Sequence, residues 1–447
     1  MGGWSNQLHE RSDGNHMDLT TTVLALTNGT EDAIVAELDI CMVTHHQADA
    51  IRAAVSEATG IPVSHVRVTA THTHAAPVTS EVSGSGWMTE GLEHIDAYMT
   101  VATDKIAGAA REARSRLVPV RVGFARGSSP LGVNRRAARP DGGVRLGLNP
   151  AGPVDHTVRV VRLDDEADHA VATIVQYSAH PTILAGGNRF VSPDYPGVTR
   201  RVVESAVGGR CLFLQGTPGD IGPCETFVDV LEPVDRLGTM LGHDAAGTAM
   251  RATARLHRQR PARNQDPSTW LTFHEYEPQP PADGTLRVER RLIEAPVRED
   301  LGDPVELRTR TNALLAELRA AQMRGASDFE IRELRVQTKG ASFRAERAEA
   351  IAGRASFPLE IHGLRIGPVA LVGVPVEPFI ELGLRIESLS PFPMTLVSGY
   401  TNGYRNYLPT AAEWARGGYE IDSSPFRPEA ADLYVEAASA VLSALSA

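Results

Sequence analysis

The chain has 447 residues, of which 42% are hydrophobic and 22% are charged. This composition is that of an ordinary globular protein and excludes a disordered or fibrous chain. Its 44 basic and 55 acidic residues give a net charge of −11, which repels phosphate backbones and disfavours nucleic acid as a partner. Only two of the basic residues, Lys105 and Lys339, are lysines, which disfavours Schiff-base chemistry and lysine-dependent phosphate loops.

The first half of the chain alternates short apolar segments, which predict β-strands, with amphipathic segments that predict helices. A helix is expected from the capping box of Thr44 and Gln47 to about residue 60, and another over 93–116. This alternation favours a mixed or parallel sheet covered by helices, so the predicted fold class is α/β with a mixed multi-layer sheet. The predicted strands are 33–40, 65–71, 119–125, 156–163, 170–179 and 210–216.

A change in composition near residue 255 marks the second half. Residues 258–285 are rich in Pro, Gln and Arg and predict a connector, and residues 304–353 predict an inserted helical hairpin that begins at the Asp303 cap. We interpret this hairpin as an insertion with solvated faces, with a lid or partner surface as the alternative. The predicted division is a main domain of residues 1–257 and 356–447, interrupted by a connector plus helical hairpin at 258–355.

The C-terminal part returns to the α/β pattern. Strands are predicted over 357–376 and 393–399, and helices over 377–389 and 428–446. A loop at 398–410, rich in Gly, Asn and Tyr, lies before the last helix.

The cysteines and the N-terminal residues indicate a compartment. Cys41, Cys211 and Cys224 lack the spacing of a disulfide framework. The first residues show neither the basic nor the apolar region of a leader, and no apolar run approaches the roughly 20 residues of a membrane-spanning helix. We therefore expect a cytoplasmic protein without stable membrane association. The sequence carries no signal for an oligomeric state.

The sharpest chemical signal is the segment VTATHTHAAP, residues 68–77. If it is the end of a strand, His72 and His74 point to the same face, because side chains two apart share a face. Paired imidazoles at the carboxyl end of a strand can build a metal or acid–base site. The alternative is an exposed strand end without chemistry. His45 and His46, at the start of a predicted helix, are interpreted as capping or surface residues.

Two further segments with chemical signals follow predicted strands. His180, in YSAHPTIL, ends an apolar strand that Pro181 stops, and ligands in α/β sheets gather at such carboxyl ends. The glycine-rich turn LQGTPGDIGPC, 214–224, lets the backbone approach a ligand closely. Asp220 in this turn is a candidate base or a partner of a ligating histidine. The alternatives are a histidine without function and an aspartate that only caps a turn.

The last two segments with chemical signals lie in the C-terminal part. Glu377, in VPVEPFIEL, is predicted to open a helix directly after a strand, where a carboxylate is either a cap or an oxygen ligand for zinc. Tyr400, Tyr404 and Tyr407 lie close together in the loop, and Tyr419 follows in GGYE. A phenolate can bind a metal, and a neutral phenol can stabilise an oxyanion.

Taken in chain order, these five segments resemble the catalytic domain of the neutral ceramidase family. THTHAAP is similar to the family's THTHSGP, and SAHPT to its HPT segment. GDIGPC resembles its GD-x-S-P-N turn, VPVEPF its PGE-x-T, and GYTNGYRNY…YE its SNTYTHY…RYE. The likeness is one of motifs, but it is collinear across nearly the whole chain.

The resemblance implies a zinc site, because the family holds one zinc ion with two histidines, a glutamate and a tyrosine. His74 would then work beside the metal and Tyr419 near the developing oxyanion. Arg135, in GVNRRA, resembles the family arginine that helps to place the substrate. Tyr404 competes with Tyr407 for the ligand position, and the spacing to Tyr419 favours Tyr407. The implied zinc ligands are His72, His180, Glu377 and Tyr407.

The chain departs from the family pattern in two respects. The family's nucleophilic serine belongs at the fourth position of GD-x-S-P-N, which here is Gly222 and has no side chain that can attack. Cys224, two residues further on, is in the wrong register to replace it. The sequence also shows neither the leader nor the immunoglobulin-like C-terminal domain of ceramidases. We therefore expect a ceramidase-like protein that does not act on a membrane lipid.

The predicted function is a zinc-dependent hydrolase that cleaves an amide or ester bond of a small soluble molecule, with zinc-bound water as the nucleophile. His74 or Asp220 would be the general base, and Tyr419 would share the oxyanion with the metal. Arg135 would hold an anionic group of the substrate. The alternatives are an acyltransferase or amide-forming enzyme on the same zinc site, a catalytically inactive zinc-containing binding protein, and a scaffold whose histidines hold nothing.

Overall fold

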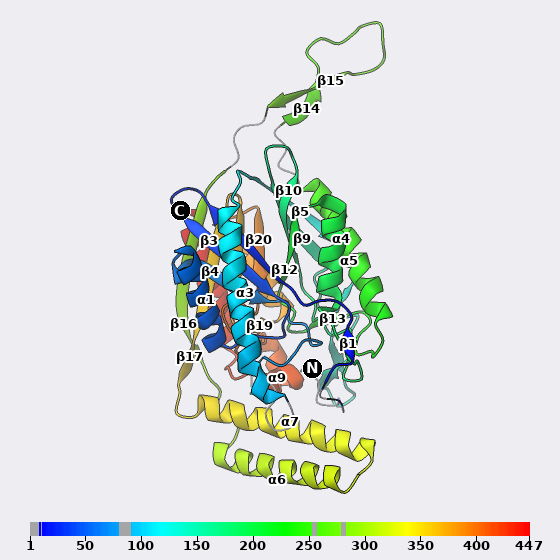
Figure 1. The fold of residues 1–447 in the computed structure, drawn as a ribbon, viewed down its shortest axis with the longest axis vertical. Coiled ribbons are helices and arrows are strands. Elements are labelled where there is room, and N and C mark those ends of the chain that lie inside the picture. The colour runs from blue at the N-terminus through cyan, green and yellow to red at the C-terminus, as the bar shows by residue number, and fades with distance from the viewer. Residues whose placement is uncertain (1–8, 10, 80–90, 253–256, 279–282) are drawn as a thin grey trace.

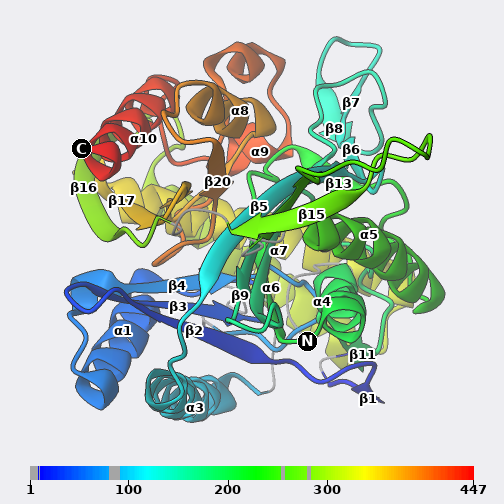
Figure 2. The same cartoon turned by 90° about the horizontal axis from the view of Figure 1, so that it is seen from above.

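The body of the protein is built on three larger sheets (Figure 1 and Figure 2). The computed structural model describes residues 9, 11–79, 91–252, 257–278 and 283–447. The first sheet is β2 (Thr21–Thr27), β3 (Asp32–Leu38) and β4 (Val66–Ala70). The second is, in spatial order, β12 (Arg210–Gln215), β10 (Ala170–Tyr177), β9 (Thr157–Asp164) and β5 (Arg121–Ser128). The third is β16 (Leu286–Pro296), β17 (Ser356–Ile366), β18 (Val369–Gly373) and β20 (Met394–Ser398).

Each larger sheet combines one parallel pair of strands with antiparallel pairs. The parallel pairs are β3 with β4, β10 with β12, and β18 with β20. The predicted α/β fold class with a mixed sheet is therefore confirmed. The two-stranded sheets are β1 (Gly14–Asn15) with β11 (Phe190–Val191), β6 (Gly132–Asn134) with β13 (Ile221–Pro223), β7 (Arg136–Ala138) with β8 (Val144–Leu146), β14 (His257–Pro261) with β15 (His274–Pro278), and β19 (Glu377–Pro378) with β21 (Tyr407–Leu408).

Helices cover the faces of these sheets, as an α/β pattern requires. The helices are α1 (His45–Thr59), α3 (Ile95–Ser115), α4 (Asp194–Val207), α5 (Glu232–Arg251), α6 (Pro304–Met323), α7 (Asp328–Ile351), α8 (Ile380–Ser388), α9 (Tyr419–Ser423) and α10 (Ala430–Ser446). Short 3₁₀ helices are η1 (Val63–His65), η2 (Leu92–His94) and η3 (Ala411–Arg416). α1 and α3 pack against the first sheet, α4 and α5 against the second, and α8 and α10 against the third.

The three sheets share one apolar core. Val35 of β3, Ile174 of β10 and Leu371 of β18 are fully buried in the same cluster. All three residues lie in apolar segments that the sequence predicts as strands. Since the sheets pack on each other through this core, the segments that follow β4, β10 and β18 are held in a fixed relation to one another.

Local sequence signals explain how several helices begin. Thr44 and Gln47 form the predicted capping box of α1, because the side chain of each accepts a hydrogen bond from the backbone N–H of the other. Asp303 and Ser327 cap α6 and α7 through their side chains. The predicted helical hairpin is therefore present, and Figure 1 shows it lying across one end of the body.

One sequence-based expectation is wrong. The helix predicted over 377–389 begins only at Ile380, and Glu377 lies in β19, paired in parallel with β21. The backbone N–H of Glu377 donates to the carbonyl oxygen of Asn406 over 2.9 Å, so strand pairing prevails over helix capping here. The connector predicted over 258–285 contains most of the antiparallel pair β14 and β15.

The insertion also contributes a strand to the main body. β16 lies within the range 258–355 but pairs along its whole length with β17 of the third sheet. The division of the chain into a main domain and an insertion stays a prediction.

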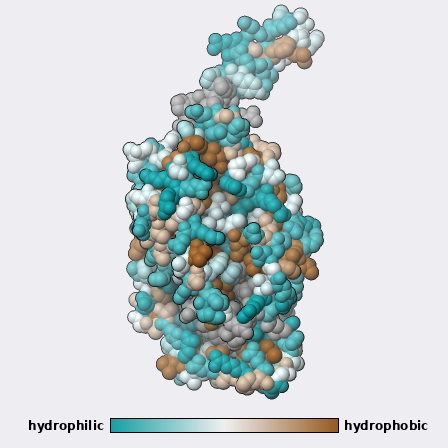
Figure 3. All heavy atoms as spheres, in the orientation of Figure 1, coloured by the Kyte–Doolittle hydropathy of each residue, from teal (hydrophilic) through white to brown (hydrophobic). Residues whose placement is uncertain are grey.

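The β14–β15 pair projects from the body at the end opposite to α6 (Figure 1), and Figure 3 shows hydrophobic atoms on this projection. Trp270 and Leu271, which lie between its strands, are largely exposed.

Among the described residues, no helix combines the length and the apolar character needed to cross a bilayer.

A buried ion cluster ties α4 to the first sheet. Arg200, 6% exposed, donates to the carboxylates of Glu37 and Asp39. Asp39 also accepts a hydrogen bond of 3.2 Å from the hydroxyl group of Thr71, the residue before His72. The cluster therefore fixes the chain at the point where it leaves β4.

We expect Arg200→Met to lower the free energy of unfolding by about 3–5 kcal/mol, because two buried carboxylates lose their counter-charge. Arg201→Met is the matched control on the same helix, since Arg201 is 57% exposed and lies 3.5 Å from Asp235. Its effect should stay below about 1 kcal/mol. Urea denaturation of both variants measures the difference, and equal effects would contradict this role of the cluster.

Candidate metal centre

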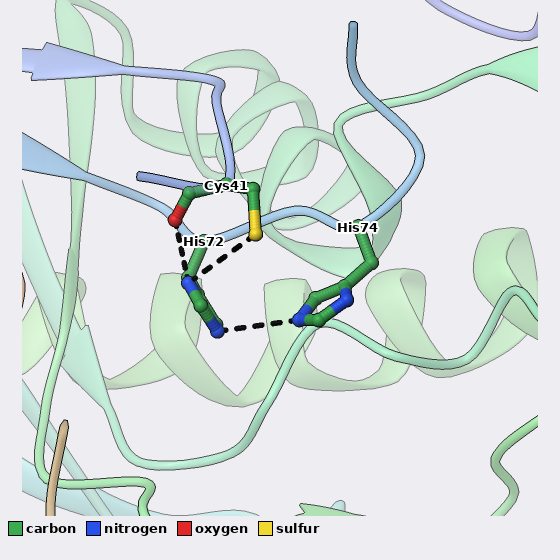
Figure 4. A group of neighbouring side chains, drawn as sticks. All are labelled: Cys41, His72 and His74. Carbon is green, nitrogen blue, oxygen red and sulfur yellow. Dashed lines mark hydrogen bonds between the residues drawn. The ribbon is translucent and has the colours of Figure 1, made fainter. Parts of the chain in front are cut away.

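His72 leaves the carboxyl end of β4 in an unusual backbone conformation. Its φ angle is 70°, in the left-handed region that non-glycine residues adopt rarely and at a cost. The ring is 1% exposed, and its Nδ1 donates to the carbonyl oxygen of Cys41 over 2.5 Å. Figure 4 shows this contact and the approach of His74 from the other side. The contact at Nδ1 leaves Nε2 as a lone-pair donor directed into the site.

His180 is oriented in the same way. It follows β10, is fully buried, and its Nδ1 donates to the carbonyl oxygen of Pro218 over 2.7 Å. Its Nε2 lies 2.8 Å from Oε2 of Glu377. A second contact that fixes the ring and its tautomer is a common feature of metal-binding histidines.

Three buried donor atoms converge at this point. Nε2 of His72 lies 3.7 Å from Oε1 of Glu377, and the ligand atoms of His72, His180 and Glu377 all lie within 4.8 Å of one another. Two imidazoles and one carboxylate are a donor set that zinc sites use. The structure therefore brings together three of the four predicted ligands.

The charge states of these groups leave lone pairs facing each other. Burial lowers the pKa of His180, and the charge of Arg135 lowers it further, so the ring is neutral. Burial alone would raise the pKa of Glu377, but its contacts with His72 and His180 and the hydrogen bond donated by Tyr404 lower it well below its ordinary value, so the carboxylate is ionised. With the His180 proton on Nδ1, no proton lies between Nε2 and the carboxylate oxygen. A bound cation removes this repulsion.

Two tyrosines contact the group of donors. The hydroxyl group of Tyr407 lies 3.5 Å from Nε2 of His180 and accepts a hydrogen bond of 3.0 Å from Arg135. The hydroxyl group of Tyr404 donates to Oε1 of Glu377. Burial raises the pKa of both phenols, and the carboxylate of Glu377 raises it further. Both tyrosines are therefore placed to act as a fourth ligand, and the assignment of Tyr407 stays a prediction.

His74 lies beside the donor group, as the sequence predicts. Its Nε2 is 3.2 Å from Nε2 of His72, and the two rings are perpendicular with centroids 4.8 Å apart. Burial lowers the pKa of His74 well below its ordinary value, and the two neighbouring histidines lower it further. The ring is neutral, so one of its nitrogens can accept a proton.

Asp220 and Arg135 have structural contacts. The carboxylate of Asp220 accepts hydrogen bonds from the backbone N–H of Ile380 over 2.8 Å and from Asn134 over 3.1 Å, and burial raises its pKa to about 7. These contacts match the alternative of a capping residue. Arg135 is 4% exposed and donates to Glu420 over 3.1 Å. The roles of Asp220 as base and of Arg135 as substrate handle stay predictions.

The donor group opens into a cavity of about 550 Å³. His72, His74 and Glu377 line it, and so does Tyr419, whose side chain is 44% exposed. The ring of Tyr419 is perpendicular to that of Tyr407, with centroids 5.7 Å apart. Tyr419 thus lies where a bound molecule can contact it.

Several residues of this cavity were not predicted from the sequence. Glu420, which is not among the described lining residues, is buried beside the site and accepts hydrogen bonds from Arg135 and Arg136. His45 lines the cavity, although its position at a helix start predicted a capping or surface role. Helix α7, for which the charged sequence predicted a solvated face, also contributes lining residues. These residues are Lys339, Phe343, Glu346, Arg347 and Ala350.

The glycine-rich turn packs directly against the strand that carries Glu377. A Cβ on Gly219 would lie 2.8 Å from the carbonyl oxygens of Glu377 and Pro378, which is too close for any side chain. At Gly222, the position of the missing serine, a Cβ would meet only the side chain of Arg135, at 3.7 Å. The space at Gly222 therefore accepts a side chain, and the space at Gly219 does not.

We expect Gly219→Ala to lower the free energy of unfolding by about 1–3 kcal/mol and to weaken metal binding, because the added methyl group displaces the backbone of Glu377. Gly222→Ala, in the same turn, should change stability by no more than about 0.5 kcal/mol. Thermal unfolding and zinc titration of the pair measure both effects. Equal behaviour of the two variants would show that the turn does not position Glu377.

Comparisons with known proteins agree with this picture. No family model matches the chain. It is 24% identical to the neutral ceramidase of Mycobacterium tuberculosis (strain ATCC 25618 / H37Rv) over 467 aligned residues, which cover 93% of this chain and 70% of that protein.

Two solved structures share the fold. A ceramidase complexed with C2 has a TM-score of 0.69 at 18% identity, over all of this chain and 72% of the other. The neutral ceramidase of Pseudomonas aeruginosa has a TM-score of 0.68 at 20% identity, over all of this chain and 71% of the other. Together with the curated relative, they confirm the resemblance to the neutral ceramidases that the motifs predict.

Proposed function

We propose that this ceramidase-like chain is a zinc-dependent hydrolase that cleaves an amide or ester bond of a small molecule. The observation that carries the proposal is the convergence of His72, His180 and Glu377, two of which, His72 and Glu377, line a cavity. The similarity to ceramidases, which are hydrolases, supports the reaction class. The absence of a serine at Gly222 supports a substrate and mechanism that differ from theirs.

The donor set fits zinc. Both imidazoles present Nε2 because their Nδ1 atoms are engaged by backbone carbonyl oxygens, and the carboxylate of Glu377 balances one positive charge. Three protein ligands and one open or phenolic position are typical of catalytic zinc sites. When bound, zinc polarises a substrate carbonyl group and lowers the pKa of a water molecule to about 7.

The residues of this chain then supply proton transfer and orientation. The neutral ring of His74 lies beside His72 and can accept the proton of an attacking water and return it to the leaving group. The hydroxyl group of Tyr419 is exposed to the cavity and can donate a hydrogen bond to the developing oxyanion. Arg135 holds the hydroxyl group of Tyr407 and acts through it as a positioning residue.

A thiol nucleophile does not fit this site, because burial raises the pKa of Cys41, the cysteine in the cavity lining, to about 12. Cys224 is half-buried, and within the described residues it is not part of the cavity lining that contains His74 and Tyr419. Burial raises the pKa of its thiol, which lowers the fraction of reactive thiolate. A water molecule is therefore the nucleophile that the site supports best.

Metal content tests the ligands. We expect purified protein to hold one zinc ion per chain, and His72→Ala, His180→Ala and Glu377→Gln each to weaken zinc binding by at least about tenfold. His169→Ala is the control, because this histidine is 80% exposed outside the site. Mass spectrometry of metal content and competitive titration measure the result. Undiminished binding in all three ligand variants would contradict the proposal.

Catalysis tests His74 and Tyr419 separately from metal binding. On a panel of N-acyl amides and esters, we expect His74→Ala to lower kcat by about 10²–10⁴-fold, and Tyr419→Phe by about 10²–10³-fold. Zinc content should be retained in both variants, because neither residue is among the three proposed protein ligands. Unchanged kcat with retained zinc would exclude these two roles, and products formed only with an added amine would favour acyl transfer.

A further inference from the structure

Helix α7 of the inserted hairpin forms one wall of the cavity above the donor group. Lys339, Phe343 and Arg347 follow one another at intervals of four residues, so they lie on one face of the helix. All three line the cavity together with His72 and Glu377. The hairpin is therefore part of the site, which corrects its interpretation as an insertion with solvated faces.

Two cations contact the aromatic ring of Phe343. Nζ of Lys339 is 5.2 Å from the ring centroid, and Cζ of Arg347 is 5.5 Å from it. Lys339, one of the two lysines of the chain, is only 9% exposed. Arg347 donates to the carbonyl oxygen of Asp422 over 3.3 Å, which anchors its guanidinium at the cavity.

The two cations share the lining of the cavity with His72 and Glu377. The charge of Lys339 is close enough to His74 to contribute to lowering the pKa of that ring. Burial lowers the pKa of Arg347, and Tyr419 and Tyr404 are the first charge partners that raise it against this effect. A molecule bound at the donor group that reaches Phe343 thus meets both positive charges.

A third cation adds to this charge. Arg405 lines the same cavity, its Cζ lies 4.7 Å above the ring of Phe357, and its Nε is buried with no hydrogen-bond partner among the described residues. Apart from the proposed ligand Glu377, the described lining holds one carboxylate, Glu346. Three cations against one carboxylate give a positive wall in a chain whose net charge is −11.

We propose that this wall is a subsite for a carboxylate group of the substrate, with the apolar part next to it packed on Phe343. The inference rests on the proposed function and names its substrate class: an amide or ester that carries a carboxylate beside an apolar or aromatic group. Lys339 and Arg347 donate charge-assisted hydrogen bonds to that carboxylate. Arg135, for which the sequence predicts this role, is occupied by Glu420 and Tyr407.

Binding of two matched probes tests the subsite. N-acetylphenylalanine carries the carboxylate, and N-acetylphenylalaninamide is its neutral counterpart. Calorimetric titration of the full-length protein, as purified with its metal, should give at least about tenfold tighter binding of the carboxylate probe. In the double variant Lys339→Met with Arg347→Met, the carboxylate probe should bind at least about tenfold more weakly, while the affinity for the amide probe stays within about twofold.

Two exposed residues give matched controls. Lys105→Met removes the other lysine, on α3, and Arg319→Met removes an exposed arginine of α6, and both should bind the probes as wild type does. Methionine keeps the length and helix propensity of the replaced side chains, and thermal unfolding with zinc content checks that the variants are folded. A contribution of the metal to carboxylate binding is the same in wild type and double variant and cancels in their comparison.

Three results would overturn the subsite: equal affinity of wild type for the two probes, no binding of the carboxylate probe, or an undiminished preference in the double variant. These failures are separate from those of the proposed function. A protein that holds zinc and hydrolyses amides without discriminating the probes loses only the subsite. A protein that discriminates the probes without turnover loses only the reaction.

Discussion

The site depends on the orientation of two buried imidazoles. Because backbone carbonyl oxygens engage Nδ1 of His72 and of His180, both rings present bare Nε2 atoms to the carboxylate of Glu377. Neutral rings and an ionised carboxylate at 2.8 Å and 3.7 Å repel each other through their lone pairs. A cation between them is coordinated by all three groups and removes this repulsion. The proposed functions of the cavity depend on this bound cation.

The fold brings these groups together through strand ends. The ligand residues follow β4, β10 and β18, and each of these strands pairs in parallel with a neighbour. Parallel pairing places carboxyl ends side by side, which is where α/β proteins collect ligands. The shared apolar core then holds the three sheets, and with them the three loops, in one arrangement. The short pairing of β19 with β21 adds the tyrosine loop to the same point.

Local patterns of the sequence predict the fold class, most strand ends and the histidines at two of those ends, whereas Glu377 as a ligand is implied by the resemblance to the neutral ceramidases. The sequence does not predict the contacts between distant segments. The charge pattern of α7 is that of a solvated helix, and only the packing of the hairpin on the body buries Lys339 beside the site. Glu377 was expected at a helix start because the later strand that pairs with it, β21, has no strand-like pattern of its own.

The central claim is that one metal ion is held by Nε2 of His72, Nε2 of His180 and a carboxylate oxygen of Glu377. Anomalous diffraction from crystals of the full chain, measured at the zinc absorption edge, tests it most directly. We predict a single peak about 2.0–2.2 Å from those three atoms. A peak at the sulfur of Cys41 and the ring of His74, which form the second possible group with His72, or the absence of any peak, would contradict it.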